Sequence, residues 1–184
     1  MGKMKIIDIS QPLFGSKVYP GDTAPSFKRV KNVATDKYNL TDISLCVHNG
    51  THIDAPLHFI ENGNGVGEIS LDVFYGKCVV KKWDGEIPTD CERLLIKGDY
   101  VVTESDAELI AKSSVRLVGV ESQSIGNPEK PMPVHLILLN AGIILLEGLV
   151  LDRVECGKYT LSAFPLNLGN CDGSPVRAVL VECE

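Results

Sequence analysis

Three of the four histidines of this chain lie within one eleven-residue segment, with an aspartate between them. The segment reads His48-Asn49-Gly50-Thr51-His52-Ile53-Asp54-Ala55-Pro56-Leu57-His58. Imidazoles grouped around a carboxylate are the ligands that divalent transition metals use in proteins. The fourth histidine, His135, is followed twelve positions later by Glu147, an acid in an otherwise apolar stretch. These residues are therefore the candidates for a metal site.

The spacing within the histidine-rich segment predicts an extended chain with bends. The candidate residues of the segment all have even numbers, and side chains two positions apart point to one face of a strand. A straight strand, at roughly 3.3 Å per residue, would separate the first and last histidines by about 33 Å, too far for a shared centre. Bends cost least at Asn49-Gly50 and Ala55-Pro56. His52 and Asp54 can reach one centre without a bend.

The segment from His135 to Glu147 can supply ligands from another direction. A helix that starts near Pro133 and ends at Gly142 would be ~12 Å long, and the strand that returns would be ~16 Å long. Glu147 would then come back to about the level of His135. Five ligands, namely His48, His52, Asp54, His135 and Glu147, exceed what one tetrahedral zinc requires. They suit two metal ions bridged by a carboxylate and a hydroxide.

Less specific interpretations of the same residues remain open at this point. A lone histidine on an apolar face is usually a hydrogen-bonded core residue, and Glu147 could be a buried partner for an arginine. Asn49 and Thr51 could orient ligands, although polar residues beside glycine more often satisfy a turn. Cys46 could approach the metals, although a core role is more common for cysteine.

Length, composition and charge limit the class of protein. The chain has 184 residues, 44% of them hydrophobic, which predicts one domain over residues 1–184 with a core of its own. A net charge of -6 and the lack of a basic run argue against nucleic acid and anionic membrane surfaces as partners. We expect a small-molecule substrate instead.

Neither a signal peptide nor a membrane span is predicted. Asp8 and Pro12 interrupt the short apolar start, and the longest apolar run, 136–150, contains Asn140 and Glu147. The six cysteines form no Cys-x-x-Cys pair. We therefore expect a cytoplasmic protein with reduced thiols.

Periodicity predicts a mixed α/β domain with more strand than helix. Short runs rich in Val and Ile predict strands at 6–9, 78–82, 94–96, 115–120, 143–146 and 176–181. An amphipathic helix is expected after Thr103, with Ser105 and Glu108 at capping-box spacing. The second helix is the one expected between Pro133 and Gly142.

The histidine segment, written His48-x-Gly50-Thr51-His52-x-Asp54-x-Pro56-x-His58-Phe59, resembles the signature of the cyclase-like metal-dependent hydrolases, which include bacterial kynurenine formamidases. Other matching stretches lie in the same order as in that family, so the resemblance spans nearly the whole chain. They are Tyr19-Pro20-Gly21-Asp22-Thr23, Arg93 to Ile96, Val118 to Val120, Glu147 to Leu149, Phe164 to Leu166, and Asp172 to Ala178.

The resemblance implies a swivelling β/β/α fold, assembled as a homodimer or homotetramer. It assigns the five residues named above as metal ligands, with Asp54 and Glu147 able to contact both of two divalent ions, zinc or manganese. His58 takes the position of the general acid/base. The chain departs from the family pattern at Glu121, where an Asp is common, and in a short segment after Ile96. Both departures concern the substrate pocket.

The implied reaction is hydrolysis of an amide, most simply an aryl formamide such as N-formylkynurenine. A divalent metal lowers the pKa of bound water to roughly 7 and polarises the carbonyl, and His58 could protonate the leaving group. The alternatives are a cyclic imide or lactone hydrolase, a lyase or cyclase on the same site, and a non-catalytic metal-binding protein. A serine triad is disfavoured because Ser122 lacks a Gly-x-Ser-x-Gly context.

Overall fold

Strands dominate the computed structural model, which describes residues 4–182. The strands and α-helices are β1 Lys5–Asp8, β2 Ser26–Lys31, α1 Val33–Asp36, β3 Leu40–Ser44, β4 His52–Asp54, β5 Tyr75–Lys81, β6 Arg93–Ile96, α2 Glu104–Ala111, β7 Leu117–Val120, α3 Met132–Asn140, β8 Ile144–Glu147, β9 Gly157–Ser162, β10 Gly173–Pro175 and β11 Val179–Glu182. Short 3-10 turns η1 Pro56–His58, η2 Val66–Glu68 and η3 Leu71–Val73 follow β4. This strand-rich α/β fold confirms the fold class expected; that the chain is one domain stays a prediction.

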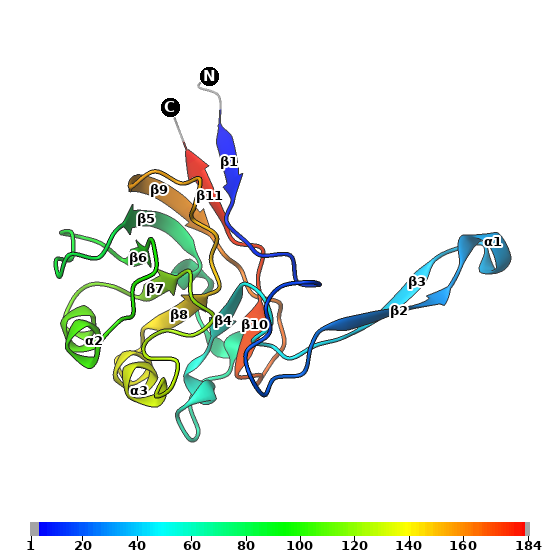
Figure 1. Cartoon of the computed structure of the whole chain (residues 1–184), viewed down its shortest axis with the longest axis horizontal. Coiled ribbons are helices and arrows are strands. Elements are labelled where there is room, and N and C mark those ends of the chain that lie inside the picture. The colour runs from blue at the N-terminus through cyan, green and yellow to red at the C-terminus, as the bar shows by residue number, and fades with distance from the viewer. Residues whose placement is uncertain (1–3, 183–184) are drawn as a thin grey trace.

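A nine-stranded sheet in the order β1-β11-β9-β5-β6-β7-β8-β4-β10 forms the body of the molecule. Its centre, β5-β6-β7-β8, is parallel, and the strands on both sides pair antiparallel. The sheet curls, and α2 and α3 lie side by side against one face of it (Figure 1). The short strand β4 lies between β8 and β10.

Alternating side chains place one apolar core on each face of this sheet. In β6, Leu94 and Ile96 point toward the helices, whereas Leu95 points to the opposite core. In β8, Leu145 faces the helices and Leu146 the other side. Residues of neighbouring strands with the same orientation therefore meet on the α3 side of the sheet.

The central elements agree with the sequence predictions. The predicted strands correspond to β1, β5, β6, β7, β8 and β11, and the predicted helices to α2 and α3. The cap of α2 was predicted wrongly: Thr103 caps the helix in a reciprocal pair with Asp106, two residues earlier than Ser105 and Glu108. No helix within residues 4–182 combines the length and the apolar character that crossing a bilayer requires.

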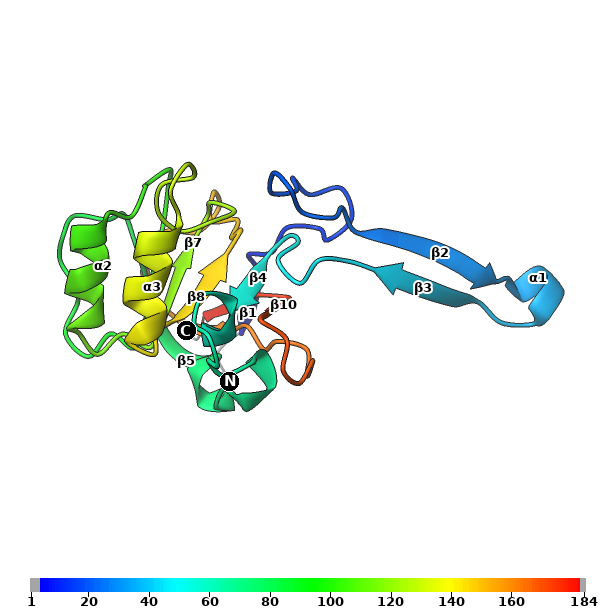
Figure 2. The ribbon, with the colours of Figure 1, turned by 90° about the horizontal axis from the view of Figure 1, so that it is seen from below.

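A hairpin that the sequence analysis did not predict projects from the body. Strands β2 and β3 pair only with each other, and the short helix α1 connects them. Figures 1 and 2 show this hairpin extending well away from the sheet and from both termini. We call residues 26–44 the arm.

Candidate metal centre

Strands β4 and β8 bring three of the candidate ligands together. The two strands pair antiparallel with His52 directly opposite Glu147, and Asp54 follows two positions further on the same face of β4. Ile53, between them, points into the opposite core. All three side chains are buried, and one ligand atom from each lies within 4.8 Å of the others. The even spacing of His52 and Asp54 in the sequence therefore places both side chains on one face of a strand, as expected.

Helix α3 adds His135 to this group from above the sheet. Its Nε2 lies 3.5 Å from Asp54 Oδ2 and 3.4 Å from Glu147 Oε1. His52 Nε2 lies 3.3 Å from Asp54 Oδ1 and 3.4 Å from Glu147 Oε2. Two imidazoles thus face the same two carboxylates. This arrangement bears out the reasoning that a helix followed by a returning strand brings Glu147 to the level of His135.

Backbone carbonyls fix the proton positions on both imidazoles. His52 Nδ1 donates to the carbonyl of Gly50 at 3.0 Å, and His135 Nδ1 donates to the carbonyl of Pro131 at 2.9 Å. A proton held on Nδ1 leaves Nε2 of the neutral ring with a free lone pair. In both residues that lone pair is directed at carboxylate oxygens. Metal-binding histidines are typically oriented in this way by their second nitrogen.

The spacing of these atoms fits a cation between them. Two ligand atoms at about 2.1 Å from a tetrahedral ion lie about 3.4 Å apart, close to the imidazole–carboxylate distances of 3.3 to 3.5 Å. Asp54 Oδ2 is buried and has no hydrogen-bond partner. A bound ion would supply the missing partner. The two buried carboxylates also need positive charge nearby.

The pKa values of the site residues also show that the buried carboxylates need positive charge nearby. Burial alone would lower the pKa of His135, but Asp54 and Glu147 outweigh it and raise that pKa to about 10. Burial likewise opposes ionisation of Asp54, yet the neighbouring imidazoles of His135, His48 and His52 hold its pKa well below the usual range. Without a metal, protons on the imidazoles therefore balance the carboxylates. A divalent ion would compete with those protons.

His48 reaches the group from a turn, as the predicted bend requires. Gly50 has a left-handed φ of 68°, which turns the chain between His48 and strand β4. His48 Nδ1 lies 2.8 Å from Asp54 Oδ1, and Nε2 lies 2.9 Å from Asp172 Oδ2. Burial lowers the pKa of this imidazole, but Asp172 and Asp54 together raise it to about 9.

His58 lies beside His48 at the edge of the group. The second predicted bend is the 3-10 turn η1, which brings the His58 ring to 4.0 Å from the His48 ring, centroid to centroid. Its Nδ1 lies 3.3 Å from Asp172 Oδ2. Burial leaves the pKa of His58 lowered, whereas neighbouring carboxylates outweigh burial and raise the pKa of the other three histidines. A neutral imidazole near the metal ligands suits proton exchange better than charge compensation.

Asp172 is a site residue that sequence reasoning did not single out. Its carboxylate contacts both His48 and His58, and its backbone carbonyl accepts a hydrogen bond from Ala55. It directly precedes β10, which pairs with β4. Its contact with His48 joins residues 124 positions apart, which no local spacing predicts. The only signal in the sequence was that Asp172 lies in a stretch that resembles the family pattern.

Several other candidates have structural roles. Thr51 accepts a hydrogen bond from Gln11 and donates to the Gly148 carbonyl, and Asn49 accepts from the backbone of Cys46, as expected of turn residues. Glu147 pairs with histidines, not with an arginine.

Cysteine and serine chemistry finds no support at this site. Cys46 and the four other cysteines within residues 4–182 are free thiols, and none joins a metal-binding group; Cys183 lies outside the described residues. Ser122 donates its hydroxyl proton to a backbone carbonyl and contacts no histidine. The histidine and carboxylate cluster is therefore the chemical centre of the described chain.

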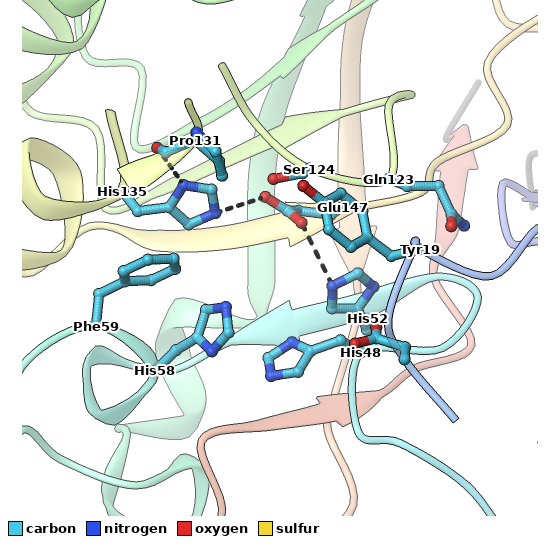
Figure 3. A pocket seen from close by; sticks show the side chains of 11 residues that line it. Tyr19, His48, His52, His58, Phe59, Gln123, Ser124, Pro131, His135 and Glu147 are labelled. Atoms are coloured by element: carbon cyan, nitrogen blue, oxygen red, sulfur yellow. Dashed lines mark hydrogen bonds and ion pairs between the residues drawn. The ribbon is translucent and has the colours of Figure 1, made fainter. Parts of the chain in front are cut away.

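The centre lines a cavity of about 180 Å³ (Figure 3). Figure 3 shows the rings of His48, His52 and His58 on one side of it, with His135 and Glu147 opposite. Gln123 also lines it, and neither amide atom of this side chain, although buried, has a hydrogen-bond partner. An amide left unpaired beside a cavity is suited to a polar ligand.

Comparisons with known proteins agree with this geometry. Residues 7–118 match the family model named Cyclase. The kynurenine formamidase of Geobacillus thermodenitrificans (strain NG80-2) is 38% identical over 200 residues, covering 95% of this chain and 96% of the relative. A solved structure described as a potential metal-dependent hydrolase with cyclase activity has a TM-score of 0.81 at 30% identity, covering 99% of this chain and all of that one. Isatin hydrolase A from Labrenzia aggregata shares the fold, with a TM-score of 0.84 at 23% identity over 98% of this chain and 94% of its own. The chain therefore belongs to the cyclase family.

Proposed function

We propose that this protein is a metal-dependent amidohydrolase that cleaves a non-peptide C–N bond, most simply that of an aryl formamide such as N-formylkynurenine. The observation that carries the proposal is the facing arrangement of His52 and His135 with Asp54 and Glu147, at the spacing of ligands around an ion. The 38% identity to a kynurenine formamidase supports the substrate class.

The metal would be held by His48, His52, Asp54, His135 and Glu147. Two carboxylates among three imidazoles are enough for two divalent ions, and nitrogen and oxygen ligands suit zinc or manganese. When bound, a divalent metal supplies Lewis-acid activation of water and of a substrate carbonyl. The remaining chemistry belongs to the side chains around the cavity.

His58 would move the proton that hydrolysis requires. Breaking an amide C–N bond with water yields a carboxylate and an amine, and the leaving nitrogen must gain a proton as the bond breaks. His58 is partly exposed, and burial lowers its pKa, so its neutral form can take a proton from water and pass it to nitrogen. Asp172, 3.3 Å from His58 Nδ1, would orient the ring and stabilise its protonated form.

The cavity beside the centre matches a small carbonyl group better than a whole aryl substrate. At about 180 Å³ it is smaller than typical ligand pockets, which range over roughly 300–1,000 Å³. A second cavity of about 470 Å³ shares Tyr19, Gln123 and Ser124 with the first. The formyl group would occupy the first cavity, and the ring would occupy the second.

Charged side chains line the second cavity and favour a zwitterionic substrate. Lys17 and Asp99 both border it, together with Glu121. The Glu121 carboxylate is already occupied by the backbone N–H groups of Gly98 and Leu151. Lys17 and Asp99 are therefore the groups that would pair with the carboxylate and ammonium of an amino acid side arm. This charge pattern supports a formamide that carries an amino acid.

The test is metal analysis of the purified protein, followed by a hydrolysis screen with that metal. The screen should include N-formylkynurenine, an uncharged aryl formamide, a cyclic imide and a lactone. We expect the formamides to be hydrolysed with incorporation of solvent oxygen into formate. Turnover of the imide or lactone alone would show that the substrate is not a formamide. An elimination product would indicate a lyase. Stoichiometric metal without turnover of any compound would contradict an enzymatic role.

A further inference from the structure

Gln123 holds two of the four polar side-chain atoms that are buried and unpaired within residues 4–182. The other two belong to Asn49 and Asp54. Asp54 lies among the proposed metal ligands, and a metal ion would supply its missing partner. The carboxamide of Gln123 instead has neither a donor for its oxygen nor an acceptor for its nitrogen. A buried amide left unpaired destabilises the folded protein, so its presence beside a cavity points to a function.

The backbone on both sides of Gln123 is fixed to the metal ligand Glu147 and its neighbour. The carbonyl of Ser122 accepts a hydrogen bond from the N–H of Gly148 at 2.8 Å. The N–H of Ile125 donates to Glu147 Oε1 at 2.7 Å. This loop follows the carboxyl end of the parallel strand β7, the edge at which α/β sheets bind ligands. Gln123 therefore keeps a fixed position relative to the proposed metal centre.

Gln123 stands where two cavities meet. It lines both the cavity of about 180 Å³ at the centre and the neighbouring cavity of about 470 Å³. Figure 3 shows its carboxamide turned away from the rings of His58 and His135. Tyr19 also lines both cavities, but its hydroxyl already donates to the Pro128 carbonyl at 3.2 Å. The carboxamide of Gln123 thus offers an uncommitted donor and an uncommitted acceptor at this junction.

The next step rests on the proposed hydrolysis of an aryl formamide. With the formyl group at the centre and the ring in the larger cavity, the bond that crosses the junction joins the formamide nitrogen to the ring. In N-formylkynurenine the adjacent ring carbon carries a ketone, whose oxygen accepts the formamide N–H within the molecule. One donor and one acceptor therefore stand side by side at this bond. A carboxamide presents the complementary pair.

We propose that Gln123 determines specificity for formamides that carry a carbonyl group at the ortho position of the ring. Its Nε2 donates to that carbonyl and its Oε1 accepts the formamide N–H, so that two bonds to the protein replace the internal one. Because neither amide atom has a partner in the free protein, the carboxamide can turn to present either atom to either group. The amide is already removed from water, so substrate binding adds no further cost for its desolvation. A formamide without the ortho carbonyl leaves Nε2 unpaired and loses this gain.

Kinetics with small formamides that lack the amino acid arm test the proposal. In ortho-acetylformanilide the carbonyl lies beside the formamide, whereas in the para isomer the same carbonyl is out of reach of Gln123. The quantity compared is the ortho-to-para ratio of kcat/KM for the metal-loaded protein, relative to that of wild type, so that the intrinsic reactivity of each isomer cancels. Gln123→Met keeps the length of the side chain and removes the amide, and it should lower the ratio at least about tenfold. Gln123→Glu should lower it as well, because a carboxylate cannot donate to a ketone.

Thermal unfolding of the same proteins gives a measurement that does not depend on turnover. Since Gln123→Met removes two unpaired buried atoms, its midpoint of unfolding should rise by at least about 3 °C. Asn167→Leu, which removes an exposed amide that lines neither cavity, is the matched control. It should keep the ratio of wild type and a midpoint within about 2 °C.

The possible failures are distinguishable. Equal loss of activity on both isomers in Gln123→Met overturns the proposal and leaves the proposed function standing. So does a lowered midpoint in that variant, which would show that ordered water or the protein satisfies the amide in the free state. Hydrolysis of N-formylkynurenine but of neither acetyl isomer also overturns it, since the ortho carbonyl would then not suffice for recognition. Hydrolysis of none of these formamides by wild type would overturn the proposed function itself, and with it this role of Gln123.

Discussion

Asp54 gives the sharpest test of the candidate metal centre. Its buried carboxylate is contacted by the imidazoles of His48, His52 and His135. The perturbation is Asp54→Asn, which keeps the shape of the side chain and removes its negative charge. Wild type and variant are first stripped of metal with a chelator and then titrated with zinc or manganese. If the centre binds metal, only wild type should be strongly stabilised by the titration.

The size of the effect follows from linkage. A ligand that binds only the folded state at 100 times its dissociation constant adds about 2.7 kcal/mol to the free energy of unfolding. In a protein of this length, each kcal/mol raises the midpoint of thermal unfolding by about 2–4 °C. Wild type should therefore gain about 5–11 °C. Asp54→Asn should gain less than about 2 °C, because one ligand and one compensating charge are missing.

The assay is thermal unfolding followed by circular dichroism, with metal content measured by mass spectrometry on the same samples. Asp152→Asn, a change in an exposed carboxylate that does not line the cavity, is the matched control and should respond as wild type does. The reasoning fails if stripped wild type shows no upward shift with any divalent metal. It also fails if Asp54→Asn shows the full shift, since the carboxylate would then not be a ligand.

Four further predictions concern the side chains around the centre. His58→Asn should keep metal content near wild type and lower kcat by about 10²–10⁴-fold; unchanged turnover would contradict its role as proton carrier. Because the charge of Asp172 raises the pKa of His58, Asp172→Asn should shift the limb of the pH–rate profile that reports His58 toward lower pH, and an unmoved limb would argue against the contact. Gly173→Ala would place a Cβ 2.7 Å from the Ile53 carbonyl oxygen and 2.8 Å from His48 Cε1. The free energy of unfolding, measured by denaturation, should therefore fall by about 1–3 kcal/mol. Metal affinity, measured by titration, should fall as well. Lys17→Ala should raise KM for N-formylkynurenine by up to about fivefold and leave KM for an uncharged aryl formamide unchanged; equal effects on both would remove the zwitterion argument.

The sheet centre and the two helices that cover it were predictable because their residues are buried periodically. Runs such as Leu117 to Val120 are apolar on both faces, which is typical of parallel strands covered on both sides. The arm was missed because none of its strand residues is buried, so burial leaves no periodic pattern there. Strand β10 was missed for a different reason. Its three residues include Gly173 and Pro175, which are uncommon in strands, and it is held in place by pairing with β4.

The candidate site was predictable to the extent that local spacing determines it. Parity placed His52 and Asp54 on one face, and matched helix and strand lengths brought Glu147 back to His135. The contacts of Asp172 depend on the pairing of β10 with β4, which no local pattern encodes. Glu121 was expected to influence the substrate pocket. It borders the second cavity, but its carboxylate joins the backbones of two loops instead of facing the ligand space freely.

The direct pairing of His52 with Glu147 also bears on how the chain folds. The two residues are 95 positions apart, and β4 must enter between β8 and β10, so this contact closes a long loop and forms slowly. A slip of one residue in that register would turn His52 and Asp54 to the opposite face of the sheet. All the ligands converge only in the native register. Metal uptake during refolding would therefore follow the pairing of β4 with β8 in the native register. The rate of metal uptake would measure the rate of that pairing.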